Sequence, residues 1–158
     1  MDEHAKKTAL RMITYGLYVL GVEHRGELAA ASINWLTQAS FTPPLVVLGV
    51  KKDGRTFALL KASRKFAVSF LKSGQRELAF AFFKPARVED GKIGGYAYEI
   101  AETGAPIISQ APAWVEGQVL SIDETGDHAV VVSQVMNAGV KRHAAPLTLK
   151  ELDLNYGG

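Results

Sequence analysis

Two long β-prone segments separated by a short turn sequence constrain the fold more than any other feature of the chain. The segments are Trp114–Asp123 and His128–Asn137, and the four residues Glu124-Thr125-Gly126-Asp127 join them. A four-residue connection that contains Gly and Asp is typical of a hairpin between antiparallel strands. A doubly wound parallel sheet needs a helical crossover after nearly every strand, and this connection has no room for one. The chain is therefore expected to form an antiparallel sheet.

Further β-prone segments alternate with only a few helical patterns. Strands are predicted at Leu17–Glu23, Glu27–Ile33, Leu45–Lys51 and Lys65–Leu71, in addition to the hairpin. The spacing of apolar residues predicts short helices at Asp2–Ile13, Arg55–Ser63 and Gln75–Phe83. Six or so strands with turns between them favour a mainly β fold, an antiparallel barrel, closed or nearly closed, that carries short helices.

Composition excludes several classes of protein. The 158 residues are 47% hydrophobic and 22% charged, which fits one soluble domain over residues 1–158. The formal net charge of +2 is too small to call for nucleic acid as a partner. The absence of Cys excludes disulfides, thiolate catalysis, iron–sulfur clusters and thiolate zinc sites. The four histidines, His4, His24, His128 and His143, lie far apart without metal-ligand spacing, so no metal site is predicted.

One apolar segment, Met12–Val22, resembles a signal peptide only in part. Asp2 and Glu3 spoil the basic region that should precede it, and charged residues follow it at 23–27. The longest fully apolar run elsewhere, Leu45–Val50, is far shorter than the roughly 20 residues that span a bilayer. We therefore expect a soluble, cytoplasmic protein that does not enter a membrane.

The uncharged polar segment Asn34–Thr42 is the first candidate for ligand binding. Its hydrogen-bonding side chains lie beside the indole of Trp35 and are those of Asn34, Thr37, Gln38 and Ser40. An isoalloxazine ring has one hydrogen-bonding edge and one apolar edge, so it needs this mixture of groups. The alternative is a turn whose Trp35 and Phe41 pack into the core.

Two other groups of residues could contact a ligand. Lys51, Lys52, Arg55 and Thr56 lie where a predicted strand leads into a predicted helix, so cations, a hydroxyl and backbone amides could hold a phosphate there. The alternative is a solvated turn. His128, in Gly126-Asp127-His128, begins a strand and could face a ligand, although a single histidine there is ordinarily a surface residue. No Walker A, G-x-G-x-x-G or G-x-S-x-G motif is present, so a nucleotide would have to bind through barrel loops.

The order of these motifs resembles that of the flavin reductase-like, FMN-binding split-barrel family. The resemblance extends over nearly the whole chain and rests on Tyr15–Val19, Ala30–Phe41, Pro43–Leu45, Phe66–Leu71, Gln75–Phe83, Gly126-Asp127-His128, Pro146-Leu147 and Asn155–Gly158. It implies a homodimeric, six-stranded split β-barrel with Greek-key character that binds FMN, and less readily FAD, near the subunit interface.

The resemblance also implies roles for individual residues. The isoalloxazine would be lined by Asn34, Trp35, Leu36, Thr37 and Gln38, with Ser40 on the same segment. The phosphate would be held by Lys51, Arg55 and Thr56, and Lys84 would lie on the polar side of the site. His128 would stand near the flavin or the incoming nicotinamide, and Tyr156 would cover the ring. The phosphate turn departs from the family pattern, since Lys52-Asp53-Gly54-Arg55 is bulkier and more basic than the serines found there more often.

These roles lead to three functional hypotheses. The first is an NAD(P)H-dependent flavin reductase that transfers a hydride from nicotinamide to flavin N5 and passes the electrons to a redox partner. Such a reaction needs no protein acid or base, so the one catalytic candidate is His128, as an aid to nicotinamide docking. The second is a flavoredoxin-like FMN electron carrier without NAD(P)H activity of its own, and the third is a β-barrel interaction module without a cofactor.

Overall fold

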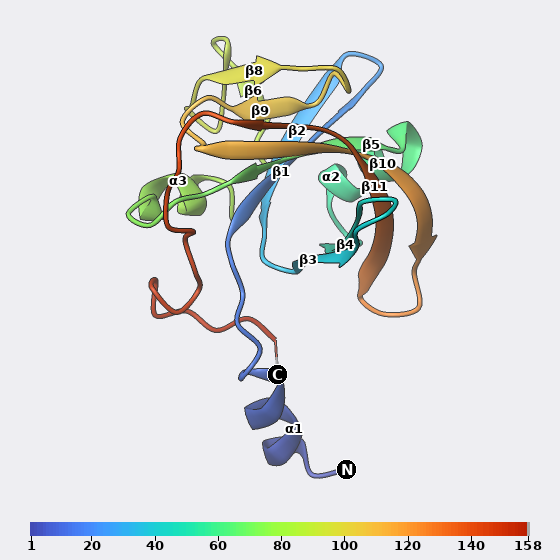
Figure 1. Ribbon diagram of the computed structural model, residues 1–158, viewed down its shortest axis with the longest axis vertical. Coiled ribbons are helices and arrows are strands. Elements are labelled where there is room, and N and C mark those ends of the chain that lie inside the picture. Colours follow the sequence, from blue (N-terminus) through green and yellow to red (C-terminus); the bar gives the residue numbers. More distant parts are fainter. Residues whose placement is uncertain (158) are drawn as a thin grey trace.

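The computed structural model describes residues 1–157, and strands dominate it (Figure 1). Over these residues the main sheet has seven strands in the order β2-β1-β5-β10-β11-β4-β3. Their bounds are β1 (Tyr18–His24), β2 (Glu27–Ile33), β3 (Leu36–Ser40), β4 (Leu45–Lys51), β5 (Lys65–Phe70), β10 (Ala113–Asp123) and β11 (His128–Val140). Neighbouring strands of this sheet pair antiparallel, so the predicted mainly β, antiparallel fold is confirmed.

The remaining elements are short. Within residues 1–157 the helices are α1 (Glu3–Leu10), α2 (Arg55–Ser63) and α3 (Arg76–Ala81). Short strands also pair, β6 (Val88–Glu89) with β7 (Lys92–Ile93) and β8 (Tyr98–Ile100) with β9 (Pro106–Ile108). Among the described helices, none combines the length and the apolar character needed to cross a membrane. Gly158, the last residue of the predicted tail motif, lies outside the described residues.

Turn residues account for the hairpins that the sequence predicted. β10 pairs with β11 across the connection 124–127, from Ala113 opposite Val140 to Asp123 opposite Val130. Between β1 and β2, Arg25 and Gly26 both have positive φ, at 51° and 84°. Two consecutive residues of this kind make the tight turn whose twist matches that of the flanking strands.

The expected six-stranded Greek-key barrel is not confirmed. The extra strand is β3, which lies in the segment expected to be a loop and pairs with β4 from Leu36 opposite Leu48 to Ser40 opposite Leu45. The backbone of β3 forms hydrogen bonds with the edge of β4. Without β3, the backbone groups along this edge would be unpaired. The sheet does not close, because β2 and β3 form its two edges over residues 1–157. The alternative that placed Phe41 in the core is also wrong, since that side chain is 88% exposed.

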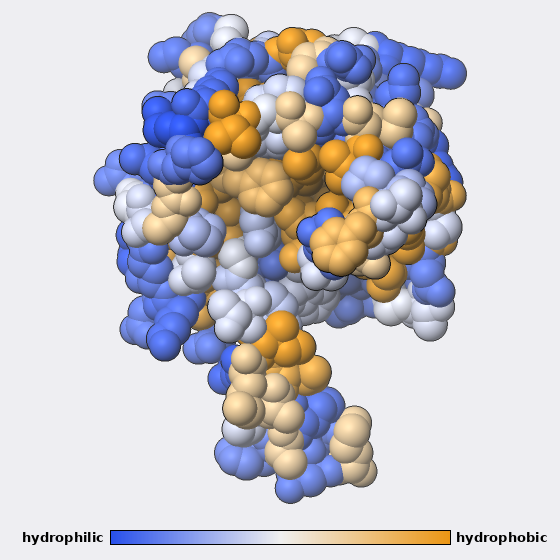
Figure 2. Space-filling model, in the orientation of Figure 1, coloured by the Kyte–Doolittle hydropathy of each residue, from blue (hydrophilic) through white to orange (hydrophobic). Residues whose placement is uncertain are grey.

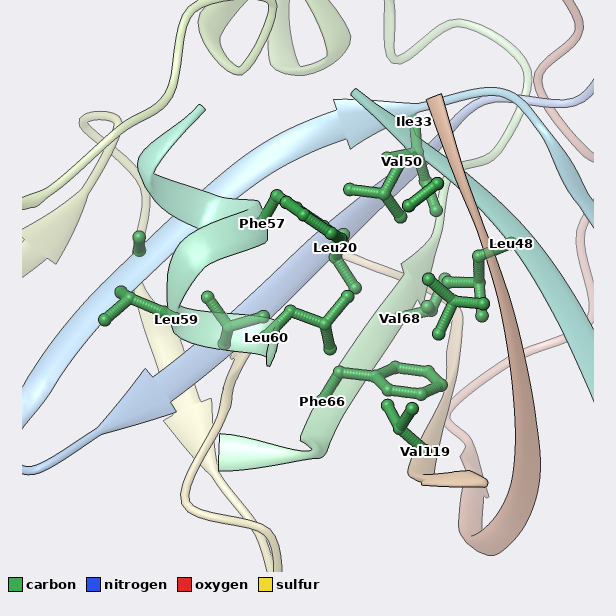
Figure 3. Close-up of a cluster of buried hydrophobic side chains, with 14 of the residues drawn as sticks. Leu20, Ile33, Leu48, Val50, Phe57, Leu59, Leu60, Phe66, Val68 and Val119 are labelled. Carbon is green, nitrogen blue, oxygen red and sulfur yellow. The ribbon is translucent and has the colours of Figure 1, made fainter. Parts of the chain in front are cut away.

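The main core fills the curve of the sheet around α2. Phe57 and Leu60 of α2 are buried and point toward side chains from β1 and β5, among them Leu20 and Phe66 (Figure 3). Each large apolar side chain that is fully buried contributes roughly 1.5–3 kcal/mol. This packing fixes the position of α2, so that the first turn of the helix lies next to the end of β4.

A second apolar cluster holds the C-terminal segment, residues 146–157, against the sheet. Leu147 and Leu149 are buried with Leu17 and Leu71. The backbone N–H of Leu147 donates to Leu71 O at 2.9 Å, and the N–H of Leu17 donates to Leu147 O at 3.0 Å. These contacts position the C-terminal segment beside β1. By contrast, α1 projects from the body, and no residue of it is buried by the rest of the described chain (Figure 1).

Glu116 is a fully buried carboxylate in β10. It accepts hydrogen bonds from the N–H and hydroxyl of Thr103, at 2.7 and 2.6 Å, from the N–H of Glu102 at 3.2 Å, and from Asn137 Nδ2 at 3.0 Å. Burial acts to raise the pKa of Glu116, but these hydrogen bonds together hold the pKa below its ordinary value. The carboxylate therefore ties the loop that precedes β9 to β10 and β11 in its ionised form.

The substitution Glu116→Gln is expected to destabilise the fold by about 1–3 kcal/mol at neutral pH, because a donor replaces one of the acceptor oxygens. Since the pKa of Glu116 is lower in the folded state, its stabilisation is full above the unfolded pKa and is lost as the pH falls through the folded pKa. Urea unfolding at several pH values should show that the loss of stability in acid is smaller in Glu116→Gln than in the wild type. The matched control is Glu99→Gln, which removes an exposed carboxylate paired with Lys141. If Glu99→Gln lowered the free energy of unfolding as much as Glu116→Gln, burial of the carboxylate would not explain the destabilisation.

Candidate functional site

A cavity of about 410 Å³ opens between β1, β2, the end of β4, the start of α2 and the C-terminal segment. We call it the main cavity. Its apolar wall includes Leu20, Val50, Phe57 and Phe83, and its polar lining includes Asn34, Lys51, Asp53, Thr56, His128 and Tyr156. Figure 2 shows a hollow with apolar side chains on the face of the molecule above α1. A volume of this size, with an apolar wall and a few polar groups, is typical of small-molecule sites.

The structure brings together part of the predicted site. The predicted residues that line the main cavity are Asn34, Lys51, Thr56, His128 and Tyr156. In the described part of the chain, the predicted residues that do not line it are Trp35, Leu36, Thr37, Gln38, Ser40, Arg55 and Lys84. Thr37 and Gln38 of β3 are exposed, and Lys84 is exposed between two lining residues, Phe83 and Pro85.

Three aromatic rings from distant parts of the sequence meet at one end of the main cavity. The centroid of the Trp35 ring lies 4.6 Å from that of His128 and 5.4 Å from that of Tyr156. Trp35 also lies directly against the backbone of Gly49, where a Cβ atom would come within 2.7 Å of the indole. A side chain at position 49 would therefore displace Trp35 from His128 and Tyr156.

A chain of hydrogen bonds joins two of these rings to an acid. His128 Nδ1 lies 2.9 Å from Asp127 Oδ1, and His128 Nε2 lies 2.7 Å from the Tyr156 hydroxyl. The interaction with His128 lowers the pKa of Asp127, while burial raises the pKa of Tyr156. Because an ionised carboxylate only accepts hydrogen bonds, Nδ1 of His128 donates to Asp127, and the other ring nitrogen, Nε2, pairs with the Tyr156 hydroxyl. This contact holds the C-terminal segment over the main cavity.

The first turn of α2 lines another part of the main cavity, next to Lys51 at the end of β4. Gly54 is the N-cap residue and has no side chain to accept from the first amides of the helix. Thr56 is 4% exposed, and its hydroxyl has no hydrogen-bond partner among the described residues. The Lys51 ammonium lies beside this turn, 3.0 Å from Asp53 Oδ2, and the hydrogen bond to Asp53 raises the pKa of Lys51. Free amides, a hydroxyl and a cation together suit an anionic group such as a phosphate.

Arg55 is engaged elsewhere. Its guanidinium Nε donates to Glu27 Oε1 at 2.7 Å, and its terminal nitrogen also pairs with the same carboxylate. This hydrogen bond lowers the pKa of Glu27. The Arg55 side chain therefore pairs with a carboxylate of β2, and Arg55 does not line the main cavity.

Several lining residues were not singled out from the sequence. Phe57 and Phe83 were assigned only to helices, and Leu149 and Leu154 only to the tail. No local pattern distinguishes such residues from core positions, because the cavity they line exists only once the C-terminal segment lies against β1. Asn34 carries a further indication of a ligand, since its buried Nδ2 has no partner in the described chain.

A comparison with protein families identifies the relationship. The family described as "Flavin reductase like domain" matches residues 10–156. The chain belongs to this family. The resemblance inferred from the sequence motifs is thereby confirmed.

Individual members of the flavin reductase-like family match over much of the chain. The NADH-dependent flavin reductase StyB of Pseudomonas fluorescens is 28% identical over 159 residues, which cover 100% of this chain and 91% of that protein. The diflavin flavoprotein A 1 of a Synechocystis species is 32% identical over 144 residues, which cover 90% of this chain but 25% of that protein. This chain thus spans about a quarter of the length of that relative.

A solved structure agrees with the sequence relatives. The NADH:FAD oxidoreductase SgcE6 of Streptomyces globisporus is 30% identical, with a TM-score of 0.73. The match covers 84% of this chain and 79% of that one. The fold described above is therefore shared with a solved member of the flavin reductases.

Proposed function

We propose that this chain binds a flavin in the main cavity and reduces it with NAD(P)H. The observation that carries the proposal is a pair of buried polar atoms, Asn34 Nδ2 and Thr56 Oγ1, that lack partners in the described chain and belong to residues lining an otherwise largely apolar cavity. Buried polar groups are rarely left unpaired, so these two atoms point to a ligand that carries polar groups. The names of StyB and SgcE6 support NADH as a donor and a flavin as the acceptor.

The residues present fit a flavin. The amide of Asn34 suits the polar edge of the ring, and apolar side chains such as Leu20 and Val50 suit its hydrocarbon edge. Lys51, Thr56 and the first turn of α2 suit a phosphate. We propose FMN as the flavin, since these groups form a site for one phosphate.

Three further predicted residues, Trp35, His128 and Tyr156, also have a role in this proposal. Trp35 packs behind the ring site against His128 and Tyr156, and Tyr156 covers the opening. His128 lies where a nicotinamide would approach, with its ring oriented by Asp127. The other predicted residues do not line the cavity, and they are Leu36, Thr37, Gln38, Ser40, Arg55 and Lys84.

A bound flavin would supply the redox chemistry by accepting a hydride from the nicotinamide at N5. The residues of the chain orient the reactants. The rings of His128 and Tyr156, with Trp35 packed behind them, would restrict where a second flat ring can stack, which favours a near-attack arrangement. The C-terminal segment contributes Leu149, Leu154 and Tyr156 to the wall of the cavity. The names of the relatives favour this reductase over the alternative, an FMN electron carrier that is reduced by another protein.

We further propose that two copies of the chain associate through β11. Side chains along its outer face are exposed although apolar, with Val130 at 46%, Met136 at 59% and Val140 at 67% exposure, and Leu120 of β10 at 49%. An apolar surface of this kind on a soluble protein usually marks an interface. A second copy is the occupant that we propose, since an exposed strand face can pair with itself about a two-fold axis. Reduced flavin or its electrons would then pass to a separate redox partner.

The phosphate end can be tested with two flavins. The double substitution Lys51→Gln and Thr56→Val is expected to weaken FMN binding roughly tenfold, because it removes a cation and a hydroxyl that contact only the phosphate. Riboflavin, which lacks the phosphate, should bind equally well to both proteins in a fluorescence-quenching titration. Lys52→Gln is the matched control, since Lys52 bonds to Glu124 O at 2.7 Å and lies outside the cavity lining. Equal losses for FMN and riboflavin would contradict the assignment of this end to the phosphate.

The β11 interface predicts an effect on mass in solution. The double substitution Met136→Glu and Val140→Glu should convert a dimer into a monomer, because each dimer would bury four carboxylates without partners. Light scattering coupled to size-exclusion chromatography measures the change. Ile100→Glu is the control, since Ile100 is 51% exposed but lies on β8. A wild-type protein that is monomeric at high concentration would overturn the proposal.

A further inference from the structure

A second cavity, of about 330 Å³, shares a wall with the main cavity. It lies between residues 11–15, which connect α1 to β1, and the C-terminal segment. Leu149, Leu154, Asn155 and Tyr156 line both cavities. A ligand with two ends could therefore occupy the main cavity and the second cavity at once, passing over this shared wall.

The lining of the second cavity combines cations with flat and apolar side chains. Arg11 and Lys150 supply the cations, and Asp153 is the acidic residue of the described lining, which leaves a net formal charge of +1. Met12, Tyr15 and Leu154 supply apolar surface. Arginine pairs well with phosphate, and tyrosine presents a flat ring on which another ring can stack. The chemistry matches an aromatic base joined to a phosphate.

Backbone contacts hold the two sides of this cavity together. The N–H of Leu149 donates to Tyr15 O at 3.0 Å, and Arg11 Nε donates to Gly157 O at 3.4 Å. The positive φ of Asp153, 56°, turns the chain so that the N–H of Leu154 reaches Leu149 O at 3.0 Å. Figure 1 shows the C-terminal segment returning toward the place where α1 joins the body. The cavity is thus formed by residues that are fixed to the body at Tyr15 and Leu149.

We propose that the second cavity binds the adenosine 5′-phosphate half of a dinucleotide whose other half enters the main cavity. The inference rests on the proposed function, because a nicotinamide that meets a flavin in the main cavity carries an adenylate that must lie nearby. Tyr156 stands between the two halves, and its hydroxyl is anchored on His128. FAD carries the same adenylate half as NADH, so the experiment separates these two sources.

Binding of the adenylate alone can be observed through methionine methyl groups. The chain has three methionines, Met1, Met12 and Met136, of which Met12 lines the second cavity. Addition of 5′-AMP, up to about 10 mM for a fragment of this size, should shift the methyl resonance of Met12 and leave that of Met136 on β11 unchanged. The double substitution Arg11→Gln and Lys150→Gln should abolish the shift. Lys7→Gln, which removes an exposed cation of α1 outside the cavity, should preserve it.

Kinetics with a truncated donor test the same site during turnover. In the Arg11→Gln and Lys150→Gln protein, KM for NADH should rise about tenfold, whereas KM for reduced nicotinamide mononucleotide, which lacks the adenylate, should not change. A different result would be an unchanged KM for NADH together with weaker binding of FAD and unchanged binding of FMN. In that case the subsite stands, and its adenylate comes from the flavin.

The two proposals fail in different ways. The subsite is overturned if 5′-AMP does not shift the methyl resonance of Met12 and the double substitution changes neither KM for NADH nor the affinity for FAD. It is also overturned if the double substitution raises KM for NADH and KM for the truncated donor by the same factor. A protein that takes up no flavin and oxidises no NADH would instead overturn the proposed function, while the Met12 resonance would still report on the second cavity.

Discussion

The burial of α2 inside the curved sheet is the interaction on which the rest of the site depends. Phe57, Leu59 and Leu60 lie in one apolar cluster with residues of β1, β4 and β5, and each contributes roughly 1.5–3 kcal/mol by burial. Because this packing holds the helix, its first turn opens onto the main cavity, with the Thr56 hydroxyl buried. Lys51 at the end of β4 is placed beside the same turn. The candidate phosphate site is thus a product of core packing.

The cover of the cavity depends on a contact between the C-terminal segment and the start of β11. Tyr156 reaches His128, 28 residues away, and His128 in turn is oriented by its neighbour Asp127. The apolar anchors Leu147 and Leu149 bring the C-terminal segment to this place. One segment therefore covers the main cavity and also forms a wall of the second cavity, which couples the position of Tyr156 to both.

The sequence predicted the features that depend on neighbouring residues. The β10–β11 hairpin, the Arg25-Gly26 turn and α2 follow from local periodicity and turn chemistry, and the structure agrees at these places. Strand β3 was missed because its pairing depends on β4 and not on its own pattern. The position of Arg55 could not be predicted either, since Glu27, its partner, lies 28 residues earlier on another strand. Family resemblance identified candidates such as Tyr156, but only the fold shows which of them line a cavity.

The most direct test of the account is the visible absorption spectrum of the protein with FMN in the absence of oxygen, before and after addition of NADH or NADPH. The account predicts that the flavin is bound and that its absorption is bleached by at least one donor, far faster than in a mixture without protein. A bound flavin whose spectrum persists with both donors would contradict the reductase and favour the electron carrier. Failure to bind FMN would contradict the assignment of the main cavity.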